Sequence, residues 1–100
     1  MDRVDILKAI ANESRLKILY WMKDPEKHFG QFLAGNERQG MVCVTEICSK
    51  LGLSQSTASQ YLATLEQAGL VKSRREGQRT CYERNEKALS ELKDFLDEDL

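Results

Sequence analysis

The fold of this 100-residue chain is decided by the stretch Thr45-Glu46-Ile47-Cys48-Ser49-Lys50-Leu51-Gly52-Leu53-Ser54-Gln55-Ser56-Thr57-Ala58-Ser59-Gln60-Tyr61-Leu62. Thr45 is placed to cap a first short helix over residues 45–51, and Gly52 can take the left-handed conformation that ends a helix. Ser54 is a good N-cap for a second helix that runs to about Ala68. Two helices joined by a short turn that contains glycine predict a helix-turn-helix.

The second predicted helix has one apolar and one polar face. Its apolar residues recur at spacings of three and four: Ala58, Tyr61, Leu62, Leu65 and Ala68. The first two turns of the other face carry short or amide side chains and no carboxylate: Gln55, Ser56, Thr57, Ser59 and Gln60. Such side chains can approach phosphates without repulsion and can bond base edges in a major groove. Together with Ser54 they are the predicted DNA contacts of this helix, and an ordinary solvated face is the alternative.

A basic hairpin is predicted directly after this helix. Residues 70–75 and 78–83 read as two strands that turn at Glu76-Gly77. Three arginines cluster at the predicted tip, where cations can neutralise phosphates or enter a minor groove: Arg74, Arg75 and Arg79. An exposed edge hairpin kept soluble by charge is the alternative. A helix-turn-helix and a basic hairpin in this order favour a winged helix that binds duplex DNA.

Several segments follow the pattern of a known family. They are Ala11-Asn12-Glu13-Ser14-Arg15-Leu16-Lys17-Ile18-Leu19, Cys43-Val44-Thr45-Glu46-Ile47-Cys48, residues 53–62, Leu65, Ala68-Gly69-Leu70-Val71 and Arg75-Glu76-Gly77-Gln78-Arg79. With them the chain resembles the ArsR/SmtB family of bacterial winged-helix repressors over nearly its whole length. The resemblance implies a homodimer that binds a partly palindromic operator. It also implies release of the operator when a metal ion, a metalloid or an oxidant changes the dimer.

Length and composition predict a single domain over residues 1–100. With 41% hydrophobic residues the chain can build one modest core, near the size at which a dimer interface adds useful stability. The expected fold is mainly α-helical, with about five helices and a small β-hairpin. The plain start at Met1, the lack of a signal peptide and the lack of a membrane-spanning apolar run predict a cytoplasmic protein.

The formal net charge of −1 hides an asymmetry. Residues 72–84 hold five Lys or Arg against two Glu, a balance of +3. Residues 85–100 hold six Asp or Glu against two Lys, a balance of −4. We expect this asymmetry to turn the basic wing toward DNA and to hold the acidic terminal helix away from it.

Apolar stripes are predicted on the first and last helices. The first stripe holds Val4, Ile6, Leu7 and Ile10, and the last holds Ala88, Leu89, Leu92, Phe95 and Leu96. The stripes could complete the core of a monomer. There are more apolar positions than so small a monomer needs, which favours a homodimer, and the family resemblance assigns the interface to these two helices.

Residues 24–40 are predicted as a long irregular connection. Pro25 and three glycines break regular structure there, while Phe29, Phe32 and Leu33 are expected to hold part of it against the body. The only histidine, His28, is expected to be a solvated or capping residue, and we assign it no metal.

The cysteines pose the question of sensing. Three cysteines in a reducing compartment predict thiols rather than disulfides, and Cys81 is expected only to pack. Arsenic-sensing members of the family begin the helix-turn-helix with Cys-Val-Cys-Asp-Leu-Cys, whereas this chain has Thr45 in place of the middle cysteine, a departure that counts against arsenic sensing. A redox or metalloid sensor made of Cys43 and Cys48 is a hypothesis, with Cys48 expected in the first helical turn. A buried packing role for Cys48 is the alternative.

Other classes of function have less support in the sequence. The last helix offers Glu91, Asp94, Asp97 and Glu98 but no histidine, so no zinc site is predicted there. The sequence offers no positioned base for a cysteine nucleophile, no phosphate-binding loop and no dinucleotide-binding fingerprint, so it does not favour an enzyme. No cofactor is predicted. The stronger rival is a winged helix that contacts another protein. A DNA affinity that falls steeply as the salt concentration rises would support the DNA-binding winged helix over the protein-contacting one.

Overall fold

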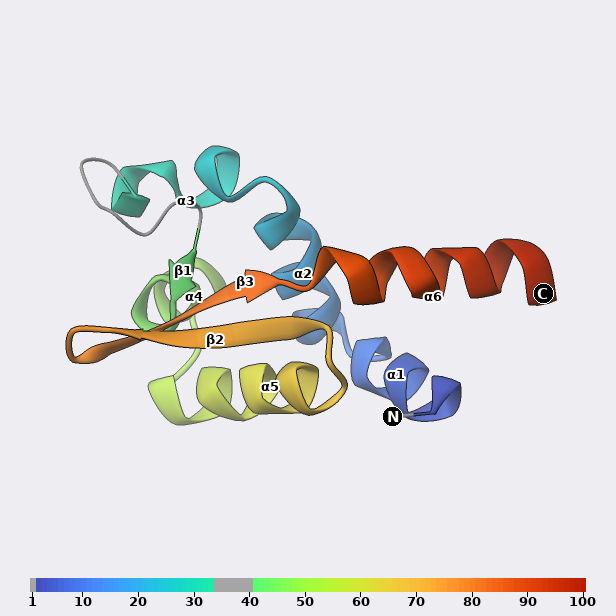
Figure 1. Cartoon of the computed structure of the whole chain (residues 1–100). Coiled ribbons are helices and arrows are strands. Elements are labelled where there is room, and N and C mark those ends of the chain that lie inside the picture. Colours follow the sequence, from blue (N-terminus) through green and yellow to red (C-terminus); the bar gives the residue numbers. More distant parts are fainter. Residues whose placement is uncertain (1, 34–40) are drawn as a thin grey trace.

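The computed structural model describes residues 2–33 and 41–100. In this part of the chain six helices accompany one small antiparallel sheet (Figure 1). The helices are α1 (Arg3–Ile10), α2 (Glu13–Lys23), α3 (Pro25–Leu33), α4 (Val44–Leu51), α5 (Gln55–Gln67) and α6 (Glu86–Asp99). The strands are β1 (Val42–Cys43), β2 (Val71–Glu76) and β3 (Arg79–Arg84). The predicted class, mainly helical with a small hairpin, is confirmed.

Helix α3 corrects the prediction of an irregular connection over residues 24–40. Proline is favoured at the first position of a helix, so Pro25 starts α3 rather than breaking it. The helix is kinked at Phe29, whose φ is −127°, and the ring of Phe29 is buried in the core as expected. The predicted roles of the Phe32 and Leu33 side chains, and of residues 34–40, lie outside the described residues.

The corner between α1 and α2 is fixed by polar side chains. The Asn12 side chain accepts a hydrogen bond from the Arg15 backbone N–H at 3.0 Å, so the predicted cap of α2 is confirmed. Arg15 in turn donates from Nε to the Ala9 carbonyl oxygen at 2.6 Å. This side chain satisfies a carbonyl that the end of α1 leaves without a helical partner.

Helix α4 begins one residue earlier than the sequence predicts. Its N-cap is Cys43 and not Thr45, because β1 brings the chain to Cys43 in an extended conformation. The Cys43 backbone N–H donates to Oε2 of Glu46 at 3.0 Å, which is the return bond of a capping box. At the other end Gly52 has a φ of +68°, as expected of a residue that ends a helix in the left-handed region.

Helix α5 follows the sequence prediction closely. Ser54 Oγ accepts from the Thr57 backbone N–H at 3.1 Å, and Ala68 is the C-cap. Gly69 then takes a φ of +78°, and the Leu70 N–H donates to the Leu65 carbonyl at 3.0 Å. The hydrogen bond from Leu70 to Leu65 reverses the direction of the chain at the end of α5, so that β2 starts next to α5.

The sheet has the order β1-β3-β2, and both pairs are antiparallel. The predicted hairpin is confirmed, with Gly77 at a φ of +66° in its turn. Strand β1 was not predicted, because two residues are too few to show alternation. It pairs Val42 with Tyr82 and Cys43 with Cys81. The chain before α4 is thereby attached to the wing.

The core lies where α2, α4 and α5 meet the base of the sheet. Its fully buried members come from all of these elements: Ile18, Ile47, Ala58, Leu62, Leu65, Leu70, Val42 and Val71. Figure 1 shows α5 running alongside β2, with the hairpin tip at one end of the molecule and α6 extending from the other. No residue of α6 is fully buried in the described part of the chain, and Leu89, near its start, is partly buried against the core.

Candidate nucleic-acid interface

The polar face predicted on α5 is on the surface. Gln55, Ser56 and Gln60 are exposed, and Thr57 and Ser59 are half-buried. Ser54 and Thr57 bond to each other, since Ser54 Oγ lies 3.0 Å from Thr57 Oγ1 and also accepts from the Thr57 N–H. These two side chains therefore order the start of the helix. The other predicted contact residues of α5 are Gln55, Ser56, Ser59 and Gln60, and they project from a helix whose start is held in place.

The wing arginines do not form the single cluster that the sequence predicts. Arg74 faces Cys81 across the hairpin and Arg75 faces Thr80, so the two arginines lie on opposite faces of it. The face of Arg75 is turned toward α5, because Ser73 on that face donates to Glu66 of α5 at 2.6 Å. Adjacent positions in a strand alternate in direction, which separates residues that are neighbours in the sequence.

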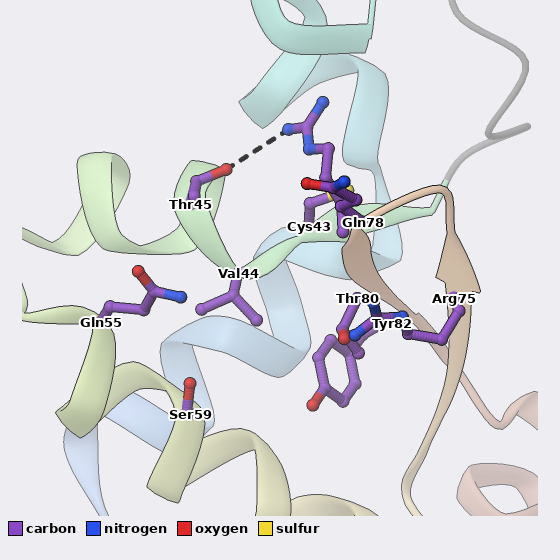
Figure 2. A pocket seen from close by; sticks show the side chains of 10 residues that line it. Cys43, Val44, Thr45, Gln55, Ser59, Arg75, Gln78, Thr80 and Tyr82 are labelled. Carbon is purple, nitrogen blue, oxygen red and sulfur yellow. Dashed lines mark hydrogen bonds between the residues drawn. The ribbon is translucent and has the colours of Figure 1, made fainter.

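A concave surface of about 270 Å³ lies between α5 and the wing. Its polar lining comes from α4, α5 and the hairpin, and includes Thr45, Gln55, Ser59, Arg75, Gln78 and Thr80. Figure 2 shows Gln55 and Ser59 on one side of this surface and Arg75 and Thr80 on the other. Hydroxyl, amide and guanidinium groups are the donors that proteins place on a sugar-phosphate backbone. The site is therefore suited to one strand of a nucleic acid.

Tyr82 closes the inner end of this surface (Figure 2). Its ring is largely buried, and burial raises the pKa of the phenol above its ordinary value, with Glu66 adding to the effect. The phenol consequently stays neutral over the physiological range and keeps its hydrogen-bond donor. Sequence reasoning missed Gln78, Thr80 and Tyr82, because only the turn of the hairpin brings them beside α5. It assigned Thr45, which lies in α4, only as a helix cap.

The Arg79 side chain is held by contacts with other residues of the same protomer. Its Nη2 lies 3.1 Å from Oε1 of Glu46 and 3.3 Å from Thr45 Oγ1. Glu46 is 2% exposed, whereas the Arg79 side chain is 51% exposed. The ion pair ties the first strand residue after the wing turn to the start of α4. The spacing of Glu46, three residues after the cap, was the available sequence signal for a capping carboxylate.

Replacing Arg79 with alanine should lower the free energy of unfolding by about 1–3 kcal/mol, because a buried carboxylate then loses its charged partner. Urea denaturation at fixed protein concentration measures this change. The matched control is Lys72→Ala, an exposed cation on the other wing strand, for which we expect less than about 0.5 kcal/mol. Equal stability of the two variants would contradict a structural role for the Glu46–Arg79 pair.

The cysteines correct the sequence prediction. Cys43 and Cys81 are joined in a disulfide, with Cα atoms 3.9 Å apart, because β1 places them opposite each other. Cys43 is therefore paired with Cys81 and not with Cys48. Cys48 is a free thiol in the second turn of α4, half-buried against the core, as the packing alternative supposed. Within residues 2–33 and 41–100 no group of three or more metal-ligating side chains comes together.

Helices α1 and α6 each expose apolar side chains, among them Val4, Leu7 and Leu96. Val4 is 59% exposed and Leu96 is 42% exposed. A groove of about 280 Å³ between the two helices is lined by the apolar residues Ile6, Ala88 and Leu92 and by the charged residues Asp2, Arg3 and Glu91. Both helices thus carry apolar area that the described protomer leaves uncovered. No helix in the described ranges is long and apolar enough to cross a membrane.

A helix-turn-helix packed beside a basic hairpin defines a winged helix-turn-helix protein. The sequence model of the family described as bacterial regulatory protein, arsR family, matches residues 37–73. The HTH-type transcriptional regulator YbzH of Bacillus subtilis (strain 168) is 47% identical over 96 residues, which are 96% of each chain. The transcriptional activator HlyU of Vibrio cholerae is 42% identical over 79% of this chain and 59% of its own.

Solved structures give the same result. The homodimeric winged helix-turn-helix DNA-binding domain of Mb0332 from Mycobacterium bovis superposes with a TM-score of 0.66 at 31% identity. The match covers 90% of this chain and 70% of that one. The chain therefore belongs to the ArsR family. It is a DNA-binding transcriptional regulator of the winged-helix type.

Proposed function

We propose that the chain is a homodimeric transcriptional repressor whose helix α5 enters the major groove while the β2–β3 wing lies on the flanking backbone. The observation that carries this proposal is the concave polar surface between α5 and the wing. A backbone strand seated there would pass between Arg75 and Ser59 and would direct the exposed N-terminal half of α5 toward base edges. The base-reading candidates are Gln55, Ser56 and Gln60, with Ser54, Thr57 and Ser59 beside the backbone.

The wing arginines have different parts in this proposal. Arg75 is the main phosphate contact, because it lines the concave surface. Arg79 lines it too, but shares its charge with Glu46. Arg74, on the opposite face of the hairpin, adds to the general positive field or reaches an adjacent groove. The balance of +3 over residues 72–84 supports a nucleic acid as the ligand of this face.

The dimer of this proposal is formed through α1 and α6. The exposed Val4, Leu7 and Leu96 support it, because pairing two protomers would remove these side chains from water. A two-fold axis between the protomers would present the two α5 helices about one DNA turn apart. The operator is then partly palindromic. The Mycobacterium bovis domain, similar in fold and sequence, is described as homodimeric.

The proposal treats residues 1–100 as one functional domain that works in the cytoplasm, where a bacterial regulator meets its DNA. It includes no catalytic step, since the family consists of regulators. The acidic α6, with a balance of −4 over residues 85–100, would lie on the side of the protein away from DNA.

Selection of binding sites from a random pool of duplex DNA tests the proposal. We expect purified protein to enrich a sequence with inverted symmetry. Affinity for the enriched site should fall steeply as salt rises, because phosphate contacts release counterions. If no sequence is enriched above non-specific binding, the proposal fails, and a winged helix that contacts a protein partner becomes the better interpretation.

Replacing Gln55 or Gln60 with alanine should relax preference at one base pair by about 1–3 kcal/mol if the amide bonds that base in two places. Competition between the selected site and single-base variants measures this preference. Gln67→Ala is the control, since this exposed amide lies at the far end of the same helix. Equal losses on every sequence would exclude base reading by these glutamines.

Replacing Arg75 with alanine is the complementary change. It should weaken binding to all sequences and reduce the slope of log affinity against log salt by about one. An unchanged slope would remove Arg75 from the phosphate contacts.

A further inference from the structure

The disulfide has no part in the function proposed above. We propose that Cys43 and Cys81 form a thiol–disulfide switch that locks the wing to the helix-turn-helix, and that the locked protein binds its operator more tightly. This inference rests on the proposed function and adds a regulation to the same site.

The disulfide connects the two halves of the DNA-binding surface. Cys43 is the N-cap of α4, the first helix of the helix-turn-helix, and Cys81 lies in the wing strand β3. The noncovalent links near this point include the two-residue pairing of β1 with β3, the Glu46–Arg79 ion pair and the hydrogen bond from Arg79 to Thr45. One covalent bond therefore adds much to the attachment of the wing at this point.

The surroundings make the two redox states structurally different. Cys43 is 1% exposed and Cys81 is 0% exposed, and they pack with the buried Met41. Two separate thiols need more room than a bonded pair, and a closely packed interior does not provide it without movement. Reduction must therefore shift β1 relative to β3.

A shift at Cys43 is transmitted to the surface that faces DNA. The Cys43 N–H is held by Oε2 of Glu46, and Oε1 of the same carboxylate accepts from Arg79. Cys43 and Arg79 both line the concave surface beside α5. Movement of β1 thus alters the position of Arg79 and the angle of the wing above α5.

The direction of the effect follows from preorganisation. A wing fixed in place loses less conformational freedom when it settles on the DNA backbone than a wing that is free to swing. The closed disulfide should therefore favour binding, which is the reverse of the oxidant-induced release that the family resemblance implies. A disulfide inside a reducing compartment is more often a reversible signal than a structural brace, which also favours a switch.

The chemistry requires a two-electron oxidant, and a hydroperoxide is the class proposed. One thiolate attacks the peroxide oxygen, releases an alcohol or water and becomes a sulfenic acid; the second thiol displaces water to form the disulfide. Two thiols lose two electrons and two protons, and the O–O bond is cleaved. A small dithiol reverses the reaction by exchange and becomes a disulfide itself.

The test compares hydroperoxide-treated and dithiol-treated full-length protein on the selected operator. Free thiols counted after denaturation should number three in the reduced protein and one, Cys48, in the oxidised protein. We expect the oxidised protein to bind about fivefold or more tightly. By thermodynamic reciprocity, operator DNA should raise the ratio of oxidised to reduced protein in a thiol–disulfide buffer by the same factor.

Two variants assign the response. Cys81→Ser should remove the difference between oxidising and reducing conditions, while Cys48→Ser, the matched control, should retain it. The wild-type comparison stands even if Cys81→Ser folds poorly, because it needs no variant.

Three results would each overturn the switch: three free thiols that persist after oxidation, equal operator affinity of the oxidised and reduced proteins, or loss of the redox response in Cys48→Ser. If both forms bind the operator equally well, the proposed repressor stands and only the switch fails. If neither form binds any sequence specifically, the proposed function fails and the switch fails with it.

Discussion

Replacing Leu96 with glutamate should convert the dimer into monomers and lower operator affinity by about 100-fold or more. In a dimer the second half-site is bound at a high effective concentration, which a monomer cannot exploit. Leu96 is 42% exposed on the apolar side of α6, so the change costs the isolated protomer little. In a two-fold interface each substitution occurs twice and places two new carboxylates in an apolar contact.

Ser90→Glu is the matched control for this variant. It adds the same charge to the same helix at an exposed position outside the apolar stripe. Sedimentation equilibrium gives the mass in solution, and titration of labelled operator gives the affinity. A Leu96→Glu protein that remains dimeric, or one that binds DNA as tightly as Ser90→Glu, would show that the interface lies elsewhere.

Replacing Leu62 with alanine should lower the free energy of unfolding by about 2–5 kcal/mol. Leu62 is fully buried on the inner face of α5, where it packs with the core of α2, α4 and the sheet. The change removes apolar contacts and leaves a cavity that the neighbouring side chains can only partly fill. Since α5 carries the predicted base contacts, operator binding should also decline near physiological temperature.

Urea denaturation measures this loss, with protein concentration held constant because dimer formation contributes to stability. Gln67→Ala on the exposed side of the same helix should change stability by less than about 0.5 kcal/mol. A Leu62→Ala protein as stable as this control would mean that α5 is not held by the core described above.

The helix-turn-helix could be predicted because its signals are local. Ser54 accepts from a backbone N–H three residues away, and Gly52 and Gly69 are needed for left-handed turns at the helix ends. Asn85 likewise caps α6 by accepting from the Ala88 N–H. Each signal depends on a few neighbouring residues, so it can be recognised without knowledge of the rest of the fold.

The features that could not be predicted depend on contacts between distant residues. Cys43 and Cys81 are 38 residues apart, and Glu46 and Arg79 are 33 residues apart. Both pairs meet only because β1 joins the sheet, and a strand of two residues carries no periodic signal. The residues of the polar α5 face were recognisable by type. The surface that they share with Gln78 and Thr80 required the position of the wing.

If the protomers pair through α1 and α6 as proposed, the lifetime of the protein in the cell should depend on its concentration. Helix α6 has 14 residues and fully buries none of them within the described protomer, and an isolated helix of about this length is marginal in water. Leu89 holds the start of α6 against the core, but in an unpaired protomer we expect the rest of the helix to fray and expose its backbone to proteases. When protomers are abundant, pairing through the proposed interface should cover the helix and slow degradation. If the protomers pair as proposed, a newly made protomer without a partner should therefore be degraded first, and the cell should hold mostly dimers able to bind both halves of an operator.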